Sequence, residues 1–142
     1  MTTEAVDTSV TLTGKVLVVE DNPVNQKLAA FILKKWGIQF DMASNGLIAC
    51  NMLKDHVYDL VLMDIQMPEM DGLDATAMIR EKERSSGKHV PIIAMTAHAM
   101  VGDKERCLAA GMDGYVSKPL RSQELFELME KILAVQTVPS TT

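Results

Sequence analysis

Hydrophobic positions along the chain fall into two alternating patterns. Short apolar runs bounded by turn residues predict five strands, at 15–20, 39–43, 59–64, 91–96 and 114–117. Stretches with helical spacing predict helices over 23–36, from 46, from 73, over 100–110 and from 122. Five strands therefore alternate with five helices, and each strand is followed by its helix.

Particular residues set the expected helix ends. Pro23 opens the first helix, Gly37 and Gly111 are expected helix stops, and Ser122 is expected to cap the last helix. The third helix is expected to end in the charged segment 81–88. Its buried face is expected to consist of Leu73, Ala77, Met78 and Ile79. The last helix is expected to turn Leu125, Leu128, Met129, Ile132 and Leu133 inward.

The order of these elements predicts an α/β fold. Near-continuous apolar strands that alternate with helices favour a parallel sheet with both faces covered and right-handed crossovers. In such sheets ligands bind at the carboxyl ends of the strands. Polar residues stand at those ends, where apolar runs stop: Glu20, Asp21, Asp64, Thr96 and Lys118. Carboxylates that would repel one another at adjacent strand ends suggest a bound cation.

Composition narrows the class of protein. The chain has 142 residues, 47% of them hydrophobic, which suits one domain with a real core. A net charge of −5 and Lys and Arg residues that do not cluster argue against nucleic-acid binding. Cys50 and Cys107 lack metal-site spacing, so we expect buried reduced thiols. Strand-sized apolar runs and the lack of a signal-peptide pattern predict no membrane contact and a cytoplasmic location. We expect tails or linkers at 1–13 and 135–142 around a domain at 14–134.

Four motifs in order carry a family resemblance. They are Val19-Glu20-Asp21-Asn22, the segment from Met63-Asp64 to Asp71-Gly72, Ala94-Met95-Thr96-Ala97 and Ser117-Lys118-Pro119. Through them the chain resembles the receiver domains of two-component response regulators over roughly 14–134. The resemblance implies a flavodoxin-like (βα)5 three-layer sandwich with a parallel five-stranded sheet in the order 2-1-3-4-5.

The resemblance also implies a magnesium-dependent phosphoryl site. Asp64 would accept the phosphoryl group as an acyl phosphate. Asp21 and Asp64 would bind Mg²⁺ (or Mn²⁺) directly, Glu20 through water, and Gln66 through its backbone carbonyl. Taken alone, Asp64 could instead cap a loop, and Glu20 could serve as an acid at a helix N-terminus.

Further roles follow from the same resemblance. Lys118, before a cis Pro119, would pair with the phosphoryl group, while the Thr96 hydroxyl and the Ala97 backbone N–H would bind its oxygens. Tyr115 would be a switch aromatic that responds to Thr96, although an ordinary strand tyrosine fits the sequence equally well. Two further positions, Gln66 and His98, would tune the lifetime of the phosphoryl group; an exposed histidine is also commonly inert.

The expected function is to receive a phosphoryl group and to switch conformation. The donor would be a phosphohistidine on a histidine kinase or histidine phosphotransfer protein, which docks on the first helix near Asn22, Val24, Asn25 and Lys27. The domain would catalyse its own phosphorylation and dephosphorylation without turning over outside substrates. The segments 20–26 and 96–100 look most like receivers of hybrid sensor histidine kinases, so the parent protein would be a histidine kinase and its own kinase core a partner. The resemblance also allows a homodimer on phosphorylation.

Three alternatives stay open. An aspartate-nucleophile phosphohydrolase would need a second Asp two residues after Asp64, where Gln66 stands. A receiver-like interaction module would signal through its fourth and fifth helices without taking phosphate. A flavodoxin-like cofactor binder would need phosphate-cradling glycines in the first loop, which reads Glu20-Asp21-Asn22-Pro23.

Overall fold

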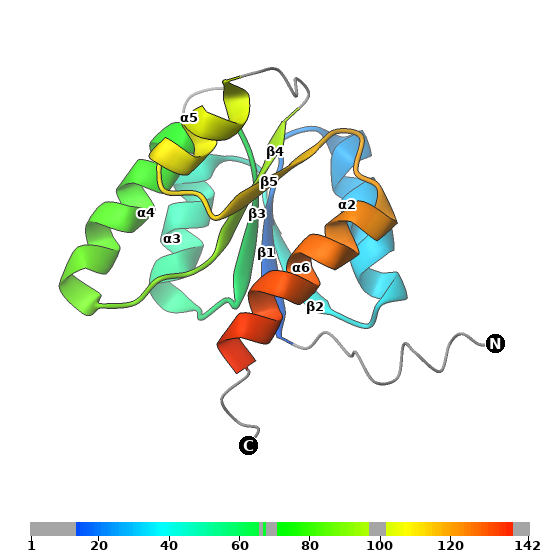
Figure 1. Ribbon diagram of the computed structural model, residues 1–142, viewed down its shortest axis with the longest axis horizontal. Helices are drawn as coiled ribbons and strands as arrows, with labels where there is room; N and C mark the ends of the chain where they lie inside the picture. The colour runs from blue at the N-terminus through cyan, green and yellow to red at the C-terminus, as the bar shows by residue number, and fades with distance from the viewer. Residues whose placement is uncertain (1–13, 66, 68–70, 97–101, 138–142) are drawn as a thin grey trace.

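The computed structural model describes residues 14–65, 67, 71–96 and 102–137 and shows a five-stranded parallel sheet (Figure 1). The strand order is β2-β1-β3-β4-β5, which confirms the order that the family resemblance implies. The strands are β1 (Lys15–Val19), β2 (Gln39–Ala43), β3 (Leu60–Asp64), β4 (Ile92–Thr96) and β5 (Gly114–Ser117). The helices are α2 (Pro23–Lys35), α3 (Gly46–Asp55), α4 (Gly72–Ser86), α5 (Asp103–Ala109) and α6 (Ser122–Thr137).

Helices cover both faces of the sheet, as the continuous apolar strands predict. In Figure 1, α2 and α6 lie on one side of the sheet and α3, α4 and α5 on the other. Strand β1 supplies both cores, because Val16 and Val18 pack with α2 and α6 while Leu17 and Val19 pack with α3 and α4. Both cysteines are buried, as expected.

The third helix differs from the sequence prediction in its length and in its buried face. Helix α4 continues through the charged segment to Ser86 and ends at Gly87, whose φ of 74° is left-handed. Glu, Lys and Arg are good helix formers, so the charged residues extend the helix instead of ending it. The buried residues are Ala75, Thr76 and Ile79 together with Gly72, whereas Ala77 and Met78 are exposed. The apolar residues in that segment were therefore a poor guide to the inward face.

Two other helices depart from their expected bounds. Helix α5 begins at Asp103 and not at residue 100, because Gly102 has a φ of 101°, outside the helical region. Helix α6 has Ser122 as its first residue and not as its cap, and it runs to Thr137. No helix among residues 14–65, 71–96 and 102–137 combines the length and the apolar character needed to cross a bilayer.

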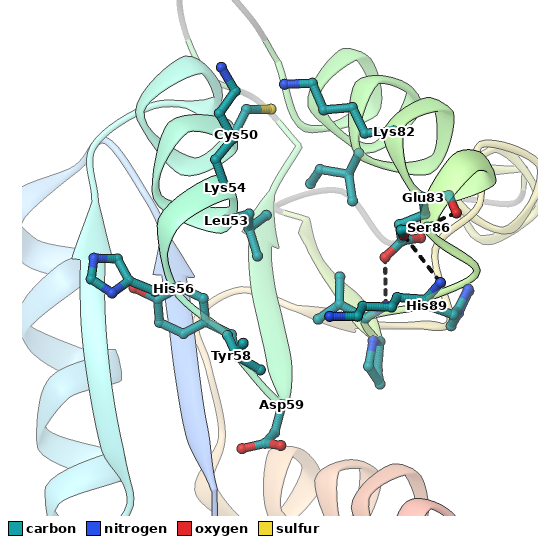
Figure 2. Close-up of a pocket in the computed structure, with 15 residues that line it drawn as sticks. Cys50, Leu53, Lys54, His56, Tyr58, Asp59, Lys82, Glu83, Ser86 and His89 are labelled. Atoms are coloured by element: carbon teal, nitrogen blue, oxygen red, sulfur yellow. Dashed lines mark hydrogen bonds between the residues drawn. The ribbon is translucent and has the colours of Figure 1, made fainter.

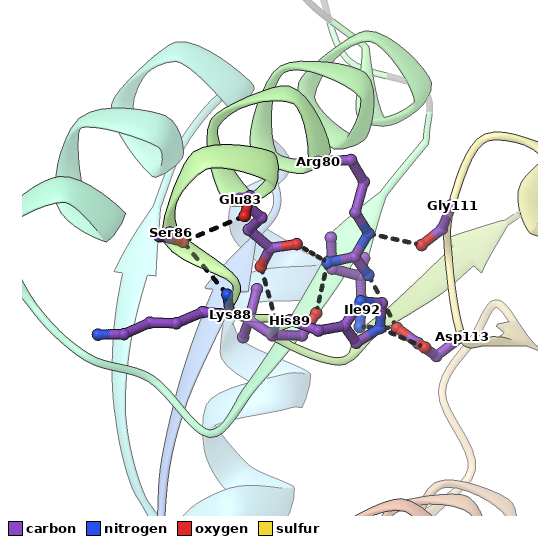
Figure 3. A network of polar contacts seen from close by, with 9 residues as sticks. Arg80, Glu83, Ser86, Lys88, His89, Ile92, Gly111 and Asp113 are labelled. Carbon is purple, nitrogen blue, oxygen red and sulfur yellow. Dashed lines mark hydrogen bonds and ion pairs between the residues drawn. The ribbon is translucent and has the colours of Figure 1, made fainter.

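Arg80 organises a polar network at the amino ends of β4 and β5 (Figure 3). Its guanidinium donates to the carbonyls of Gly111 and Val90 and forms ion pairs with Glu83 at 2.6 Å and Asp113 at 2.9 Å. Asp113 in turn accepts from the backbone N–H of Ile92. Since the arginine satisfies two carbonyls and two carboxylates, it ties α4 to both strands.

We expect Arg80→Met to lower the free energy of unfolding by about 2 kcal/mol, because four acceptors lose a charged donor. Urea unfolding measures this loss. Arg84→Met is the matched control, since Arg84 forms an ion pair with Glu81 at 3.5 Å on an exposed face, and its loss should change stability little. Equal losses in the two variants would contradict a special role for Arg80.

Candidate functional site

The parallel register brings the predicted polar residues to one edge of the sheet. Val19 is paired with Met63, Asp64 with Met95, and Thr96 with Ser117, so the carboxyl ends of β1, β3, β4 and β5 are level. Glu20, Asp64 and Thr96 are each only 1% exposed. A glutamate and an aspartate are therefore buried side by side, which is costly unless each charge is compensated.

Glu20 is held in place by the start of α2. Its backbone N–H donates to Ala43 O, and its Oε2 accepts from the Asn22 backbone N–H at 3.1 Å and from Asn25 Nδ2 at 3.4 Å. Gln26 Nε2 donates to the Glu20 carbonyl at 2.6 Å. Asn22 also caps α2 by accepting from the backbone N–H groups of Val24 and Asn25. We expected Asn22 and Asn25 to border a docking partner, and the structure shows that they also position Glu20.

Lys118 joins the two buried carboxylates. Its Nζ lies 3.0 Å from Asp64 Oδ2 and 3.1 Å from Glu20 Oε1. The peptide bond between Lys118 and Pro119 is cis, as the resemblance implied. Burial by itself would lower the pKa of Lys118, but hydrogen bonds and charge from Asp64 and Glu20 outweigh it, so the pKa is raised. Lys118 is therefore an ammonium at neutral pH.

We expect Lys118→Met to lower the free energy of unfolding by about 2 kcal/mol at pH 7, because Asp64 and Glu20 would then repel each other or take up a proton. The ammonium's contribution is complete below the unfolded lysine pKa of about 10.4 and is lost as pH rises through the higher folded pKa. Unfolding curves of the two proteins should therefore converge at strongly alkaline pH. A constant gap at all pH values would show that the loss is not electrostatic.

Three carboxylates form a cluster that suits a hard cation. Carboxylate oxygens of Glu20, Asp21 and Asp64 lie within 4.8 Å of one another; the first and last are buried and Asp21 is exposed. Oxygen ligands with one open side fit Mg²⁺, which keeps several waters. Gln66, expected to add a backbone carbonyl, lies outside the described residues.

Thr96 and Tyr115 lie on the neighbouring strands β4 and β5. The Thr96 carbonyl accepts from the Lys118 backbone N–H at 2.7 Å, which links the ends of β4 and β5. Tyr115 is half-buried on β5, paired in register with Ala94, and packs against the core on the α3 and α4 side. Ala97 and His98 lie outside the described residues.

Gly72 permits the close approach of α4 to the end of β3. A Cβ added at Gly72 would lie 2.4 Å from the Asp64 carbonyl oxygen and 2.8 Å from Ile65 Cα, both backbone atoms. The Gly72 N–H donates to the Ile65 carbonyl, and the Asp71 side chain caps α4 by accepting from the Asp74 N–H. The sequence motif that contains Gly72 does not reveal this contact with Asp64.

Comparison with known proteins places this site in a family. Residues 16–130 match the family described as "Response regulator receiver domain". The chain is 49% identical over 120 residues to "Hybrid signal transduction histidine kinase I" of Dictyostelium discoideum, covering 81% of the chain and 7% of that protein. It is 42% identical to "Probable histidine kinase 4" of Oryza sativa subsp. japonica, covering 86% of the chain and 14% of that protein. The chain thus spans a small part of these kinases.

Two solved structures of receiver domains support the same family assignment. The receiver domain of a sensor histidine kinase from Pseudomonas aeruginosa PAO1, with a magnesium ion coordinated in its active site cleft, is 39% identical, with a TM-score of 0.78 and coverage of 87% of this chain and 99% of that one. The Saccharomyces cerevisiae receiver of Ssk1, solved with the phosphotransfer protein Ypd1, is 30% identical, with a TM-score of 0.82 and coverage of 89% and 93%. The chain therefore belongs to the response regulator receiver domains, the phosphoryl-accepting modules of two-component phosphorelays.

Proposed function

We propose that Asp64 is the phosphoryl acceptor of this receiver domain. The observation that carries the proposal is the pair of ion contacts from Lys118 to Asp64 and Glu20, which holds a buried carboxylate at a strand end beside a fixed cation. A carboxylate oxygen of Asp64 would form a bond to phosphorus as the phosphorus–nitrogen bond of the donor phosphohistidine breaks, and the imidazole leaves with the bonding electrons and takes a proton. Lys118 would then pair with a phosphoryl oxygen.

Magnesium is the cation we propose for the acidic cluster. Asp21 and Asp64 would hold it directly, Glu20 through water and Gln66 by its backbone carbonyl; the P. aeruginosa receiver supports the assignment because it carries magnesium in its active site cleft. Bound there, the ion would offset negative charge on the transferring group. The buried position of Glu20 and Asp64 keeps bulk water from screening that attraction.

We expect Mg²⁺ to raise the melting temperature of the unphosphorylated protein, because three crowded carboxylates gain a counter-charge. At a concentration 100 times the dissociation constant the gain would be about 2.7 kcal/mol. Asp21→Asn should remove most of this shift, whereas Asp74→Asn, an exposed acid on α4, should retain it. A shift that survives in Asp21→Asn would place the ion elsewhere.

We also propose how the phosphoryl group is sensed. The Thr96 hydroxyl and the Ala97 N–H would bind its oxygens, and Tyr115 would change position with Thr96. Gln66 and His98 would set how fast water removes the group. The proposal for Thr96 is supported by its burial next to Asp64 and by the bond from the Lys118 N–H to its carbonyl.

A histidine phosphotransfer protein or histidine kinase is the partner we propose. The Ssk1 receiver was solved with such a protein, and two apolar side chains of α2 are exposed here, Val24 at 73% and Phe31 at 66%. We propose that the chain comes from a hybrid histidine kinase, acts in the cytoplasm, and takes its phosphoryl group from its own kinase core or from the phosphotransfer protein. Phosphorylation could then be read out as a homodimer or by the attached domains.

Incubation with a ³²P-labelled phosphohistidine protein and Mg²⁺ tests the proposal. We expect label to move to the receiver, to require the cation and to be lost in alkali, as an acyl phosphate would be. If the receiver accepts label from no phosphohistidine donor, the result would favour the alternative function, a receiver-like interaction module that does not take phosphate. Steady release of phosphate from small phosphomonoesters would instead indicate a phosphohydrolase.

A further inference from the structure

A pocket opens at the other end of the sheet from Asp64, between the carboxyl-terminal halves of α3 and α4 (Figure 2). Its volume is about 710 Å³, within the range of small-molecule sites. The loops that precede β3 and β4 form its floor, through Asp59 and Pro91. None of the residues that we assign to phosphoryl transfer lines it.

Part of the pocket lining is apolar, and hydrogen bonds fix the position of the α4 wall. Leu53 comes from α3 and Ile79 from α4, and Val90 lies on the loop between α4 and β4. Val57 stands at the rim with 80% of its side chain exposed. The network of Arg80 fixes the α4 wall, because Glu83 accepts from Arg80 and from the Val90 N–H (Figure 3). The apolar surface therefore exists before any ligand arrives.

More basic than acidic side chains line the pocket. Three lysines line it: Lys54, Lys82 and Lys88. Its two acids are already engaged, since Asp59 accepts from the Lys15 backbone N–H at 2.8 Å and Glu83 is paired with Arg80. Among the described residues no acidic group forms an ion pair with any of the three lysines. A local excess of positive charge thus borders an apolar pocket in a chain whose net charge is −5.

Two of these lysines converge on one end. Figure 2 shows Lys54 and Lys82 extending toward the end of the pocket where the Cys50 sulfur lies. Burial raises the pKa of the Cys50 thiol, and both lysines act against that rise, as ammonium groups close to the sulfur would. The helices end at the opposite side, where their last carbonyls carry partial negative charge. An anionic group would therefore sit between Lys54 and Lys82, with an apolar body extending down toward Leu53 and Val90.

We propose that this pocket binds a small amphipathic monoanion, an aliphatic or aromatic chain that ends in a carboxylate. The carboxylate lies between Lys54 and Lys82, and the apolar chain covers Leu53, Ile79 and Val90. This site and Asp64 lie at opposite ends of the sheet.

Titration with octanoate, followed by amide chemical shifts in a ¹H–¹⁵N spectrum, tests the proposal. We expect saturable shifts centred on Leu53, Lys82 and Val90 and absent from the strand ends near Asp64. Octanamide, which has the same shape without charge, and butyrate, which has the charge without the long chain, should each bind about tenfold more weakly or worse. Equal binding of either analogue would overturn the proposal.

Variants that remove one lysine charge from the pocket give a second test of the proposal. Lys54→Gln and Lys82→Gln should each weaken octanoate binding about five- to tenfold, because one charged hydrogen bond is lost, and should leave octanamide unaffected. Both lysines are exposed, so the variants should fold, which the same spectra check. Lys131→Gln on α6 is the matched control and should bind octanoate as the unaltered protein does. Unchanged binding in both pocket variants, or shifts that map away from the pocket, would refute the site.

Discussion

Asp64→Asn should lower phosphoryl transfer from a phosphohistidine donor by a factor of about 1000 or more. An amide oxygen is a poor nucleophile, and no other described carboxylate combines burial at a strand end with a contact to Lys118 except Glu20. Glu20 is held in a fixed position by hydrogen bonds from Asn22 and Asn25 to its Oε2, so it would have to give up these contacts to move into the place of Asp64. Labelling with ³²P, followed on denaturing gels, measures the loss.

The matched control for this substitution is Asp74→Asn. Asp74 is an exposed acid in the first turn of α4, so the change in net charge is the same while the site is untouched. Transfer to this variant should stay within about twofold of the unaltered protein. Label that persists in Asp64→Asn, at the rate seen in the control, would contradict the assignment of the acceptor.

Gly72→Ala should lower the free energy of unfolding by about 3 kcal/mol or more and weaken phosphorylation as well. The new Cβ would lie 2.4 Å from the Asp64 carbonyl oxygen and 2.8 Å from Ile65 Cα, and neither backbone atom can move without shifting the end of β3. A shift of about 1 Å in the nucleophile can cost on the order of 100-fold in rate. Urea unfolding and the rate of ³²P transfer measure the two effects.

Gly114→Ala is the comparison for Gly72→Ala. A Cβ at Gly114 would approach only the end of the Leu128 side chain, at 3.3 Å, and that side chain can move by a few tenths of an ångström. The cost should be about 1 kcal/mol or less, with phosphorylation unchanged. Equal losses at the two glycines would show that loss of a glycine, and not the contact with Asp64, is responsible.

The strands of the sheet could be predicted from the sequence because they are buried on both faces. All five residues of β3 and of β4 are buried, so their apolar runs are continuous and end abruptly at Asp64 and Thr96. The charged end of α4 and the start of α5 were misjudged, because helix propensity in one case and the backbone angle of Gly102 in the other outweighed the hydrophobic pattern.

The site was predictable as a set of residue types and not as a set of contacts. Strand ends identified Glu20, Asp64, Thr96 and Lys118, because parallel strands bring their carboxyl ends to one edge. The pairing of Lys118 with Glu20 as well as Asp64 depends on side-chain positions across β1, β3 and β5, which spacing does not reveal. The contact of Gly72 with the Asp64 backbone is likewise visible only in three dimensions.

Identification of the phosphorylated residue tests whether Asp64 is the phosphoryl acceptor. The protein is phosphorylated by a phosphohistidine donor with Mg²⁺ and then treated with borohydride, which reduces an acyl phosphate on aspartate to homoserine. Peptide mass spectrometry locates the reduced residue. We expect homoserine at position 64, and we expect its formation to depend on the donor and the cation. Homoserine at another aspartate, or a stable phosphate on a hydroxyl or an imidazole with none at position 64, would contradict it.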